Sequence, residues 1–242
     1  MFKWKQLHRL MELLSWPDEE LTPRYNVAPT QMAPAVRAAI GDVWSGGRAG
    51  QGTSGREGVL LCWGLIPSWS DDPAIGSRMI NARAESVDTK PAFRQAFRRR
   101  RCLVPISGFY EWRKVEGAKR KQPFYIRPRP GVKTDGDEAP IFALAGLWER
   151  WRGEGGLVES FTIVTTEAND LLKPLHDRMP VILPREAWEL WLDPGVDDAA
   201  RLKGLLRPFD PGRMEAYPVG LAVNRPAHDA PDCIQPLSGG PA

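Results

Sequence analysis

The segment IFALAGLWERWRGEGGLVESFTIVTTE, residues 141–167, contains two apolar runs separated by a glycine-rich stretch. The first run is IFALAGLWERW (141–151) and the second is SFTIVTTE (160–167). Apolar, aromatic and β-branched residues in such short runs favour strands. The intervening RGEGG supplies glycines, which adopt turn conformations at little steric cost. The segment therefore predicts two strands joined by a turn, and it places a β-sheet at the centre of the fold.

Further strands are predicted on both sides of this pair. CLVPISGFYEW (102–112) and QPFYIRP (122–128), with the charged turn VEGAKRK (115–121) between them, have the pattern of a hairpin. VLLCWGLIP (59–67) is a strand candidate that ends at Pro67, and MPVILP (179–184) is a short buried strand. The chain is therefore rich in β-structure.

Helical patterns lie between these strands. Residues 2–14 carry apolar side chains on or near one side, and Thr166 is positioned to cap a helix running from Glu167 toward Leu175. Three more helices are predicted at 90–100, 185–192 and 197–206, and polar loops at 41–58 and 129–139. Because no repeat or linker divides the chain, we predict one α+β domain over residues 1–242, with a curved β-sheet or barrel core and peripheral helices.

The charge of the chain is nearly balanced. Its 242 residues carry 33 Lys and Arg against 30 Asp and Glu, a formal net charge of +3. This excess alone says little about an anionic partner, but Arg94 and the four arginines at 98–101 fall within eight residues. Two interpretations of this cluster stay open: a solvated helix face, or a surface that binds nucleic acid.

The cysteine pattern bears on metals and on location. Cys62, Cys102 and Cys233 are far apart and form no C-x-x-C pair, so we expect no zinc knuckle, no disulfide framework, no metal and no cofactor. Scattered thiols suit a reducing compartment, which predicts a cytoplasmic protein. No uninterrupted apolar run reaches membrane-spanning length, so no membrane partner is expected.

Two polar positions stand close together in MINARAES (79–86). Asn81 and Arg83 are two residues apart, so in an extended segment they point to the same side. An amide beside a guanidinium suits the binding of a phosphate or the positioning of a carbonyl. From the spacing alone, a surface strand with a local salt bridge to Glu85 is the preferred interpretation.

Glu111 and His176 are candidates for proton transfer. Glu111 is flanked by Tyr110 and Trp112, and a partly desolvated carboxylate has a raised pKa. The alternative is a strand-end Glu paired with Arg113. His176 lies in PLHDRMPVIL (174–183), and histidine is a natural general acid or base. A purely structural histidine is the alternative there.

In their order along the chain, these segments resemble the SRAP family, the SOS response-associated peptidases, also called abasic site processing proteins. The resemblance covers about residues 24–242. It rests on RYNVAPTQ (24–31), WGLIPSW (63–69), INARAES (80–86), RRCLVPISGFYEW (100–112), KQPFYI (121–126), FALAGLWE (142–149), FTIVTTEAN (161–169) and HDRMPVIL (176–183).

The resemblance implies an activity on DNA. Members of the family recognise abasic sites in single-stranded DNA and become covalently linked to them. Removal of the initiator Met leaves an N-terminal Cys, whose α-amine condenses with the ring-opened sugar aldehyde and whose thiol closes a thiazolidine. An α-amine with a pKa near 8 is partly neutral at pH 7, and one residue that carries both nucleophiles gains from proximity.

The same resemblance assigns roles by motif. It implies that Asn81 positions the N-terminal residue and the abasic sugar, and that Arg83 holds a flanking phosphate. Glu111 would handle protons on the sugar or the nucleophile. His176 would do acid–base work at the ring-opened sugar, including reversal of the crosslink. We further expect Trp69 to stack on a neighbouring base.

The N-terminus departs from the family pattern. The family begins Met-Cys-Gly-Arg, whereas this sequence begins Met-Phe-Lys-Trp. Either the true start lies upstream, or the protein is a variant that binds but cannot form the ring. For the sequence as written we expect weak or no stable crosslinking.

The sequence therefore leaves two functional hypotheses. The first is an enzyme of the DNA damage response that processes abasic sites by crosslinking, with associated autoproteolytic peptidase or lyase chemistry. The second is a non-catalytic protein that binds single-stranded or damaged DNA. In both, the partner is single-stranded DNA containing abasic sites, and the protein is expected to be a monomer.

Overall fold

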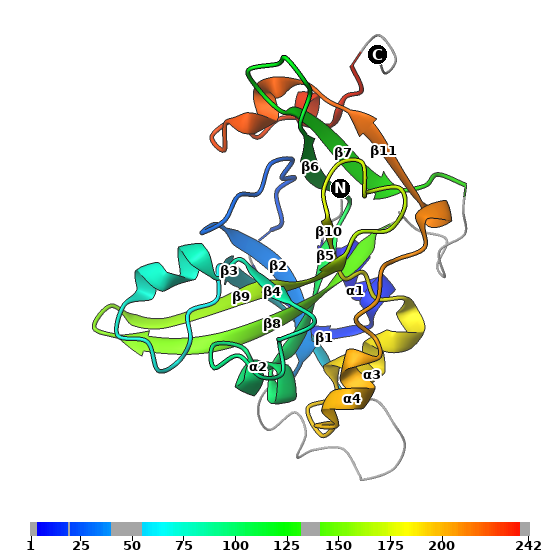
Figure 1. The fold of residues 1–242 in the computed structure, drawn as a ribbon. Coiled ribbons are helices and arrows are strands. Elements are labelled where there is room, and N and C mark those ends of the chain that lie inside the picture. Colours follow the sequence, from blue (N-terminus) through cyan, green and yellow to red (C-terminus); the bar gives the residue numbers. More distant parts are fainter. Residues whose placement is uncertain (1–3, 19, 40–54, 132–140, 238–242) are drawn as a thin grey trace.

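The computed structural model describes residues 4–18, 20–39, 55–131 and 141–237. Within these ranges, five strands close into a barrel in the order β3–β2–β5–β8–β9, and the pairing of β3 with β9 completes the circle (Figure 1). The predicted α+β class and barrel core are confirmed. The barrel strands are β2 (Met32–Ala38), β3 (Arg56–Trp63), β5 (Arg101–Ile106), β8 (Phe142–Gly153) and β9 (Gly156–Glu167).

Three short strands extend the barrel at its ends. β1 (Leu13–Ser15) runs parallel to the start of β3. β4 (Asn81–Arg83) runs parallel to β9, and β10 (Arg178–Pro180) runs antiparallel to the end of β9. Thr165 of β9 is the Cα partner of both Arg83 and Pro180. Because one residue pairs on both sides, β4 and β10 flank the end of β9 from opposite edges.

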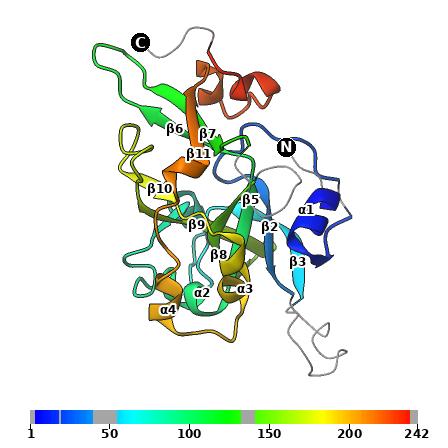
Figure 2. The same ribbon diagram turned by 90° about the vertical axis from the view of Figure 1, so that its right-hand side faces the viewer.

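A second sheet stands beside the barrel, with strand order β11–β7–β6 (Figures 1 and 2). It consists of β6 (Phe109–Arg113), β7 (Gln122–Pro128) and β11 (Met214–Pro218). The hairpin of β6 and β7 confirms the prediction. The single strand expected over 102–112 is instead divided, with β5 in the barrel and β6 in the second sheet. A Cβ on Gly108 would lie 2.5 Å from the carbonyl oxygen of Ile126, so the close approach at this break needs glycine.

The two faces of the barrel strands pack into two separate cores. One face, represented by Val36, Leu103 and Val164, packs against the helices and is the outside of the barrel. The other face, represented by Leu61 and Phe161, is the inside, and it packs against the second sheet. The covering helices are α1 (Trp4–Met11), α2 (Arg94–Arg99), α3 (Trp188–Leu192) and α4 (Ala199–Lys203).

Several element ends differ from the predictions. The first helix stops at Met11, since Glu12 has a φ of 54° and the next residues join β1. The strand expected over 59–67 stops at Trp63, because Gly64 turns the chain with a φ of 128°. Of the predicted loops, residues 41–54 and 132–139 lie outside the described residues, and Arg56–Gly58 belong to β3.

Short 3-10 helices complete the description: η2 (Pro73–Arg78), η3 (Arg185–Ala187), η4 (Pro211–Arg213), η5 (Leu221–Asn224) and η6 (Pro231–Ile234). In the part of the chain that the structure describes, no helix has the length and apolarity needed to cross a lipid bilayer.

Candidate functional site

Asn81 and Arg83 emerge at one rim of the barrel. On β4 they pair with Ile163 and Thr165 of β9, and Ala82 between them is buried. Because strand residues alternate, Asn81 and Arg83 point away from the core that holds Ala82. Their partner Ile163 packs against the inner core, on the side covered by the second sheet. The amide and the guanidinium are therefore exposed on the same side of the rim.

Glu111 approaches this rim from the second sheet. On β6 it lies opposite Phe124, and Phe109, two residues earlier, packs against the inner core of the barrel. Tyr110 and Trp112 point the other way into a separate core. The side chain of Glu111 therefore faces the barrel, as strand alternation requires.

The electrostatic environment of Glu111 favours its neutral form. Burial raises the pKa of the carboxyl, and electrostatic interactions with His176 and Lys121 oppose this only in part. The backbone N–H of Trp112 also lowers the pKa, whereas Asp177 raises it. A carboxyl that is half-buried and has a raised pKa can trade protons closer to neutral pH than an ordinary glutamate.

His176, whose charge influences the pKa of Glu111, lies in a loop and not at the end of a helix. The predicted cap at Thr166 is wrong, since Thr166 belongs to β9 and pairs with Met179 of β10. The following residues form turns, in which the backbone N–H of His176 donates to the carbonyl of Leu172 at 2.9 Å. Pairing with β10 keeps the chain extended through Glu167, so the helix expected over 167–175 does not begin there.

Asn169 shapes this loop, and sequence reasoning gave it no role. Its side chain is buried, and its Nδ2 donates to the carbonyl of Phe209 at 2.7 Å. Its Oδ1 accepts from the backbone N–H of Leu172 at 3.1 Å. A buried polar residue that is fully hydrogen-bonded fixes a single loop conformation. An Asn two residues after a strand is the only sequence signal of this function, and it is a weak one.

The imidazole of His176 has defined neighbours at Nδ1. The backbone N–H of Arg178 donates to Nδ1 at 3.0 Å, and Oδ1 of Asp177 lies 3.2 Å away. The carbonyl oxygen of Arg178 also lies 3.3 Å from Nδ1, so this nitrogen can accept from the backbone N–H or donate to the carbonyl, according to the tautomer of the ring. When the ring is protonated, Asp177 can accept from Nδ1 and stabilise the positive charge.

An ion pair ties the His176 loop to the segment that carries Asn81 and Arg83. The Arg178 guanidinium donates to Oε1 of Glu85 at 2.6 Å and to Oε2 at 3.0 Å, and it also reaches the carbonyl of Thr165 at 2.7 Å. The alternative prediction for Glu85, a salt bridge to Arg83, is replaced by this pair with Arg178. The structure therefore brings both segments together across the end of β9.

Trp69 lies apart from these interactions. It is 60% exposed and sits in the loop between β3 and η2. The indole of Trp151 donates to the carbonyl of Ser70 at 2.6 Å, which anchors this loop to the β8–β9 hairpin. In the part of the chain that the structure describes, Trp69 takes no part in the Arg178–Glu85 pair or in the environment of Glu111.

Part of the arginine cluster binds groups of the protein itself. Arg101 is buried, and its guanidinium donates to backbone carbonyls, among them that of Trp191 at 2.5 Å. Arg100 pairs with Glu149 at 2.6 Å and Arg99 with Asp197 at 3.1 Å. The interpretation of this run as a DNA-binding surface is therefore wrong for the buried Arg101, whereas the exposed Arg94, Arg98 and Arg99 are consistent with either interpretation.

Comparison with known proteins identifies the family. The family model for "SOS response associated peptidase (SRAP)" matches residues 2–226. The chain belongs to the SRAP family. The match begins upstream of the motifs and ends before the last sixteen residues, so SRAP similarity includes the segment that forms α1.

Relatives of this SRAP chain carry names that refer to abasic sites. It is 40% identical over 220 residues to the abasic site processing protein YoqW of Bacillus subtilis, covering 90% of this chain and 88% of that protein. It is 29% identical over 248 residues to the mouse abasic site processing protein HMCES, covering 93% of this chain and 68% of that protein.

Solved structures share the SRAP fold described above. A protein of Bacteroides thetaiotaomicron is 34% identical with a TM-score of 0.65, covering 74% of this chain and 77% of that one. A phage-related protein of Bordetella bronchiseptica is 30% identical with a TM-score of 0.60, covering 87% of this chain and 88% of that one.

Proposed function

We propose that this protein recognises abasic sites in single-stranded DNA and processes them where the barrel rim meets the second sheet. The observation that supports the proposal is the electrostatic interaction of Glu111 with His176, which lie on segments next to the rim from which Asn81 and Arg83 emerge. A carboxyl with a raised pKa and an imidazole suit proton transfer at a ring-opened sugar. The names of the relatives support DNA with abasic sites as the substrate.

Asn81 and Arg83 are proposed to hold the damaged nucleotide. Two residues along a strand span about 6.6 Å, so the amide and the guanidinium reach different parts of one nucleotide. Arg83 presents its positive charge to a flanking phosphate, and Asn81 presents an amide to the sugar. Trp69, with its exposed ring, is proposed to stack on a neighbouring base.

Glu111 and His176 are proposed to move protons in a covalent reaction. An N-terminal amine adds to the sugar aldehyde, and water leaves as the imine forms. Neutral Glu111 donates a proton to the departing hydroxyl. A thiol on the same residue then adds across the C=N bond, so that sulfur bonds to carbon and the thiol proton passes to nitrogen. His176 serves as acid and base at the sugar, including the reverse reaction.

The experiment uses two versions of the protein, because the sequence has Phe2 where the family has Cys. One version is the sequence as given, and the other carries Met-Cys-Gly-Arg in front of it. Each is incubated with an abasic single-stranded oligonucleotide and with an intact one of the same sequence. We expect a heat-stable crosslink only on abasic DNA, and a much higher yield from the Cys version.

Variants at Glu111 and His176 separate an enzyme from a binder. In the Cys version, Glu111→Gln and His176→Ala should slow crosslinking by about 100-fold, the usual contribution of general acid–base catalysis. Their affinity for intact single strands should stay within about twofold, because phosphate contacts supply most non-specific affinity and weaken with salt. Crosslinking by both variants that is as fast as in the unaltered Cys version, or equal on intact DNA, would contradict the proposal, and no crosslinking by any version would leave a non-catalytic DNA-binding protein.

A further inference from the structure

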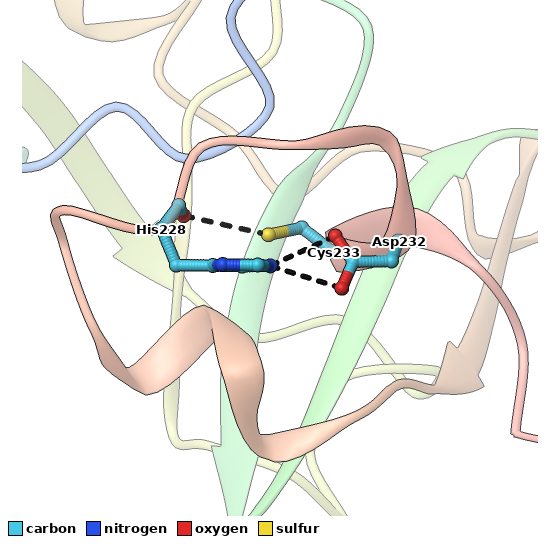
Figure 3. Close-up of side chains that lie close together, drawn as sticks. All are labelled: His228, Asp232 and Cys233. Carbon is cyan, nitrogen blue, oxygen red and sulfur yellow. Dashed lines mark hydrogen bonds and ion pairs between the residues drawn. The ribbon is translucent and has the colours of Figure 1, made fainter.

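A histidine, an aspartate and a cysteine gather in the C-terminal part of the chain. His228, Asp232 and Cys233 each offer one ligand atom, and these atoms all lie within 4.8 Å of one another (Figure 3). Asp232 and Cys233 belong to η6, and His228 precedes it by three residues. None of the three belongs to the residues proposed for DNA chemistry.

The present contacts show how the three side chains are aligned. Nε2 of His228 lies 2.8 and 2.9 Å from the two carboxylate oxygens of Asp232. Sγ of Cys233 points to the backbone carbonyl of His228 at 3.6 Å. The thiol residue is fully buried, whereas the side chains of His228 and Asp232 are 38% and 52% exposed. An ion can therefore approach from solvent through the imidazole and the carboxylate and reach the sulfur beneath them.

We propose that His228, Asp232 and Cys233 form a Zn²⁺ site. Imidazole nitrogen, carboxylate oxygen and thiolate sulfur are all common zinc ligands. Around a tetrahedral zinc ion, such atoms stand about 3.3–3.8 Å apart. The observed separations differ from these values by about 1 Å at most, which side-chain rotation can absorb. Three protein ligands leave the fourth position to water.

Binding requires a defined proton balance. Cys233 loses its thiol proton to solvent as sulfur bonds to the metal. The imidazole of His228 bonds through Nε2, so its proton moves to Nδ1, and the Asp232 carboxylate binds without losing a proton. One proton is released for each ion bound, so metal affinity rises with pH.

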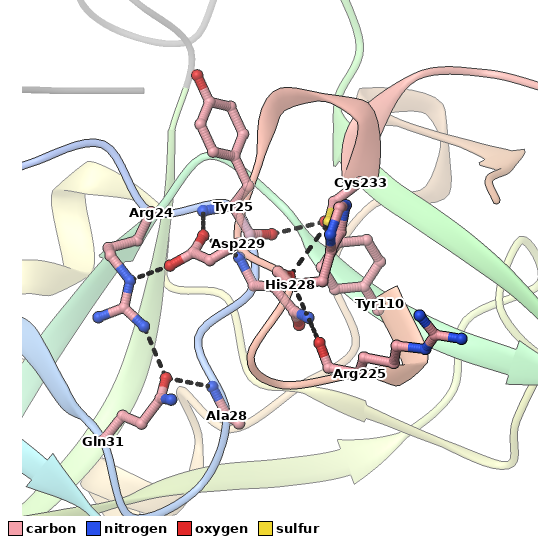
Figure 4. A network of polar contacts seen from close by, with 10 residues as sticks. Arg24, Tyr25, Ala28, Gln31, Tyr110, Arg225, His228, Asp229 and Cys233 are labelled. Carbon is pink, nitrogen blue, oxygen red and sulfur yellow. Dashed lines mark hydrogen bonds and ion pairs between the residues drawn. The ribbon is translucent and has the colours of Figure 1, made fainter. Parts of the chain in front are cut away.

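The site is attached to a turn that holds the segment 24–26 (Figure 4). The carbonyl of His228 accepts from Nδ2 of Asn26 at 3.0 Å. Asp229, the next residue, accepts from the backbone N–H of Asn26 at 3.0 Å, from the backbone N–H of Tyr25, and from the guanidinium of Arg24. A metal bound at His228 would therefore stiffen this turn and the segment that it holds.

Cobalt titration of the reduced protein, prepared without a histidine tag, tests the site. One equivalent of Co²⁺ should give the near-ultraviolet sulfur-to-cobalt charge-transfer band and the visible bands of a tetrahedral ion. Zn²⁺ should displace it, and one equivalent of Zn²⁺ should raise the melting temperature. Cys233→Ser should lose the near-ultraviolet band, and His228→Ala should weaken cobalt binding by about 10-fold or more.

Cys62→Ser is the matched control, because Cys62 is a free thiol on β3 outside the cluster. It should keep the full spectrum and the zinc-dependent melting temperature. Circular dichroism verifies folding, and His228→Gln at a partly exposed position serves if Cys233→Ser does not fold. Absence of the charge-transfer band in the unaltered protein, or its survival in a folded Cys233→Ser or His228→Gln protein at full affinity, would overturn the proposal.

Discussion

The guanidinium of Arg178 donates two hydrogen bonds to the carboxylate of Glu85, at 2.6 Å and 3.0 Å. Arg178 follows His176 by two residues, and Glu85 follows Arg83 by two residues. The pair therefore sets the distance between the residue proposed for proton transfer and the residue proposed for phosphate binding. Hydrogen bonding to Arg178 lowers the pKa of Glu85, so the pair persists down to acidic pH.

Glu85→Gln should affect activity more than stability. The side chain of Glu85 is 58% exposed, and exposed ion pairs contribute at most about 1 kcal/mol to the free energy of unfolding. Crosslinking to abasic DNA should slow several-fold, because the His176 loop loses the ion pair between Arg178 and Glu85 that holds it in place. Urea unfolding and a crosslinking time course measure the two effects. Asp197→Asn, which removes the exposed Arg99–Asp197 pair at 3.1 Å, is the control and should change neither. Equal rates for both variants would refute the positioning role.

Glu111 should make stability fall as pH rises. Burial raises the pKa of its carboxyl in the folded protein above the unfolded value of about 4.3. Between these two pKa values the folded state binds more protons than the unfolded state, so the free energy of unfolding decreases with pH across this window. Glu111→Gln removes this term. The variant should therefore gain stability relative to the unaltered protein as pH rises from 4 to neutrality, as measured by urea unfolding at each pH. A constant difference between the two proteins would contradict the raised pKa.

The fold was predictable where its signals are local. The two apolar runs in 141–167 and the charged turn before Gln122 depend on near neighbours along the chain, and both hairpins formed as expected. The break between β5 and β6 was not predictable, because it depends on how closely Gly108 approaches Ile126 on another strand. Thr166 was misassigned for the same reason, since its pairing with Met179 comes from a later segment.

In the candidate site, too, some residues could be found from local sequence signals and others could not. Glu111 and His176 stood out because polar groups beside apolar strands are unusual in sequence. Asn169 and Arg178 act through partners that are distant in sequence, such as Phe209 and Glu85, so their functions required coordinates. The cluster at His228 escaped prediction because its ligands lack the C-x-x-C spacing by which zinc sites are recognised.

Arg101 should be essential for stability although it lies in a basic run. It is 2% exposed, and the loss of its buried charge-assisted hydrogen bonds should lower the free energy of unfolding by about 3 kcal/mol in Arg101→Met. Its guanidinium donates to the carbonyls of Phe97, Arg98, Trp191, Asp193 and Val196. Arg98→Met, at an exposed position on α2, should change stability by less than about 0.5 kcal/mol. Similar losses in both variants would contradict the structural role of Arg101.

Asn26 and Asn81 allow one chemical change to be tested in two environments. Asn26 is buried, and its Nδ2 lies 3.0, 3.1 and 3.0 Å from the carbonyl oxygens of Val223, Arg225 and His228. Asn26→Asp would place a carboxylate oxygen against three carbonyl oxygens. Asn81 is exposed on β4, where a carboxylate meets water.

Asn26→Asp should therefore lower the free energy of unfolding by about 2–4 kcal/mol at pH 7, because it leaves buried acceptors without a donor. Burial and the facing carbonyls would raise the pKa of the new carboxyl, so acidification toward pH 4 should restore part of the loss, as its neutral form can donate again. Asn81→Asp should change stability by less than about 0.5 kcal/mol but should weaken binding to abasic DNA, since it sets a negative charge beside the phosphates. Urea unfolding at pH 4 and pH 7, together with fluorescence anisotropy on an abasic oligonucleotide, measures both quantities. If Asn81→Asp were as destabilising as Asn26→Asp, or if it bound abasic DNA with unchanged affinity, Asn81 would not be a surface residue that contacts DNA.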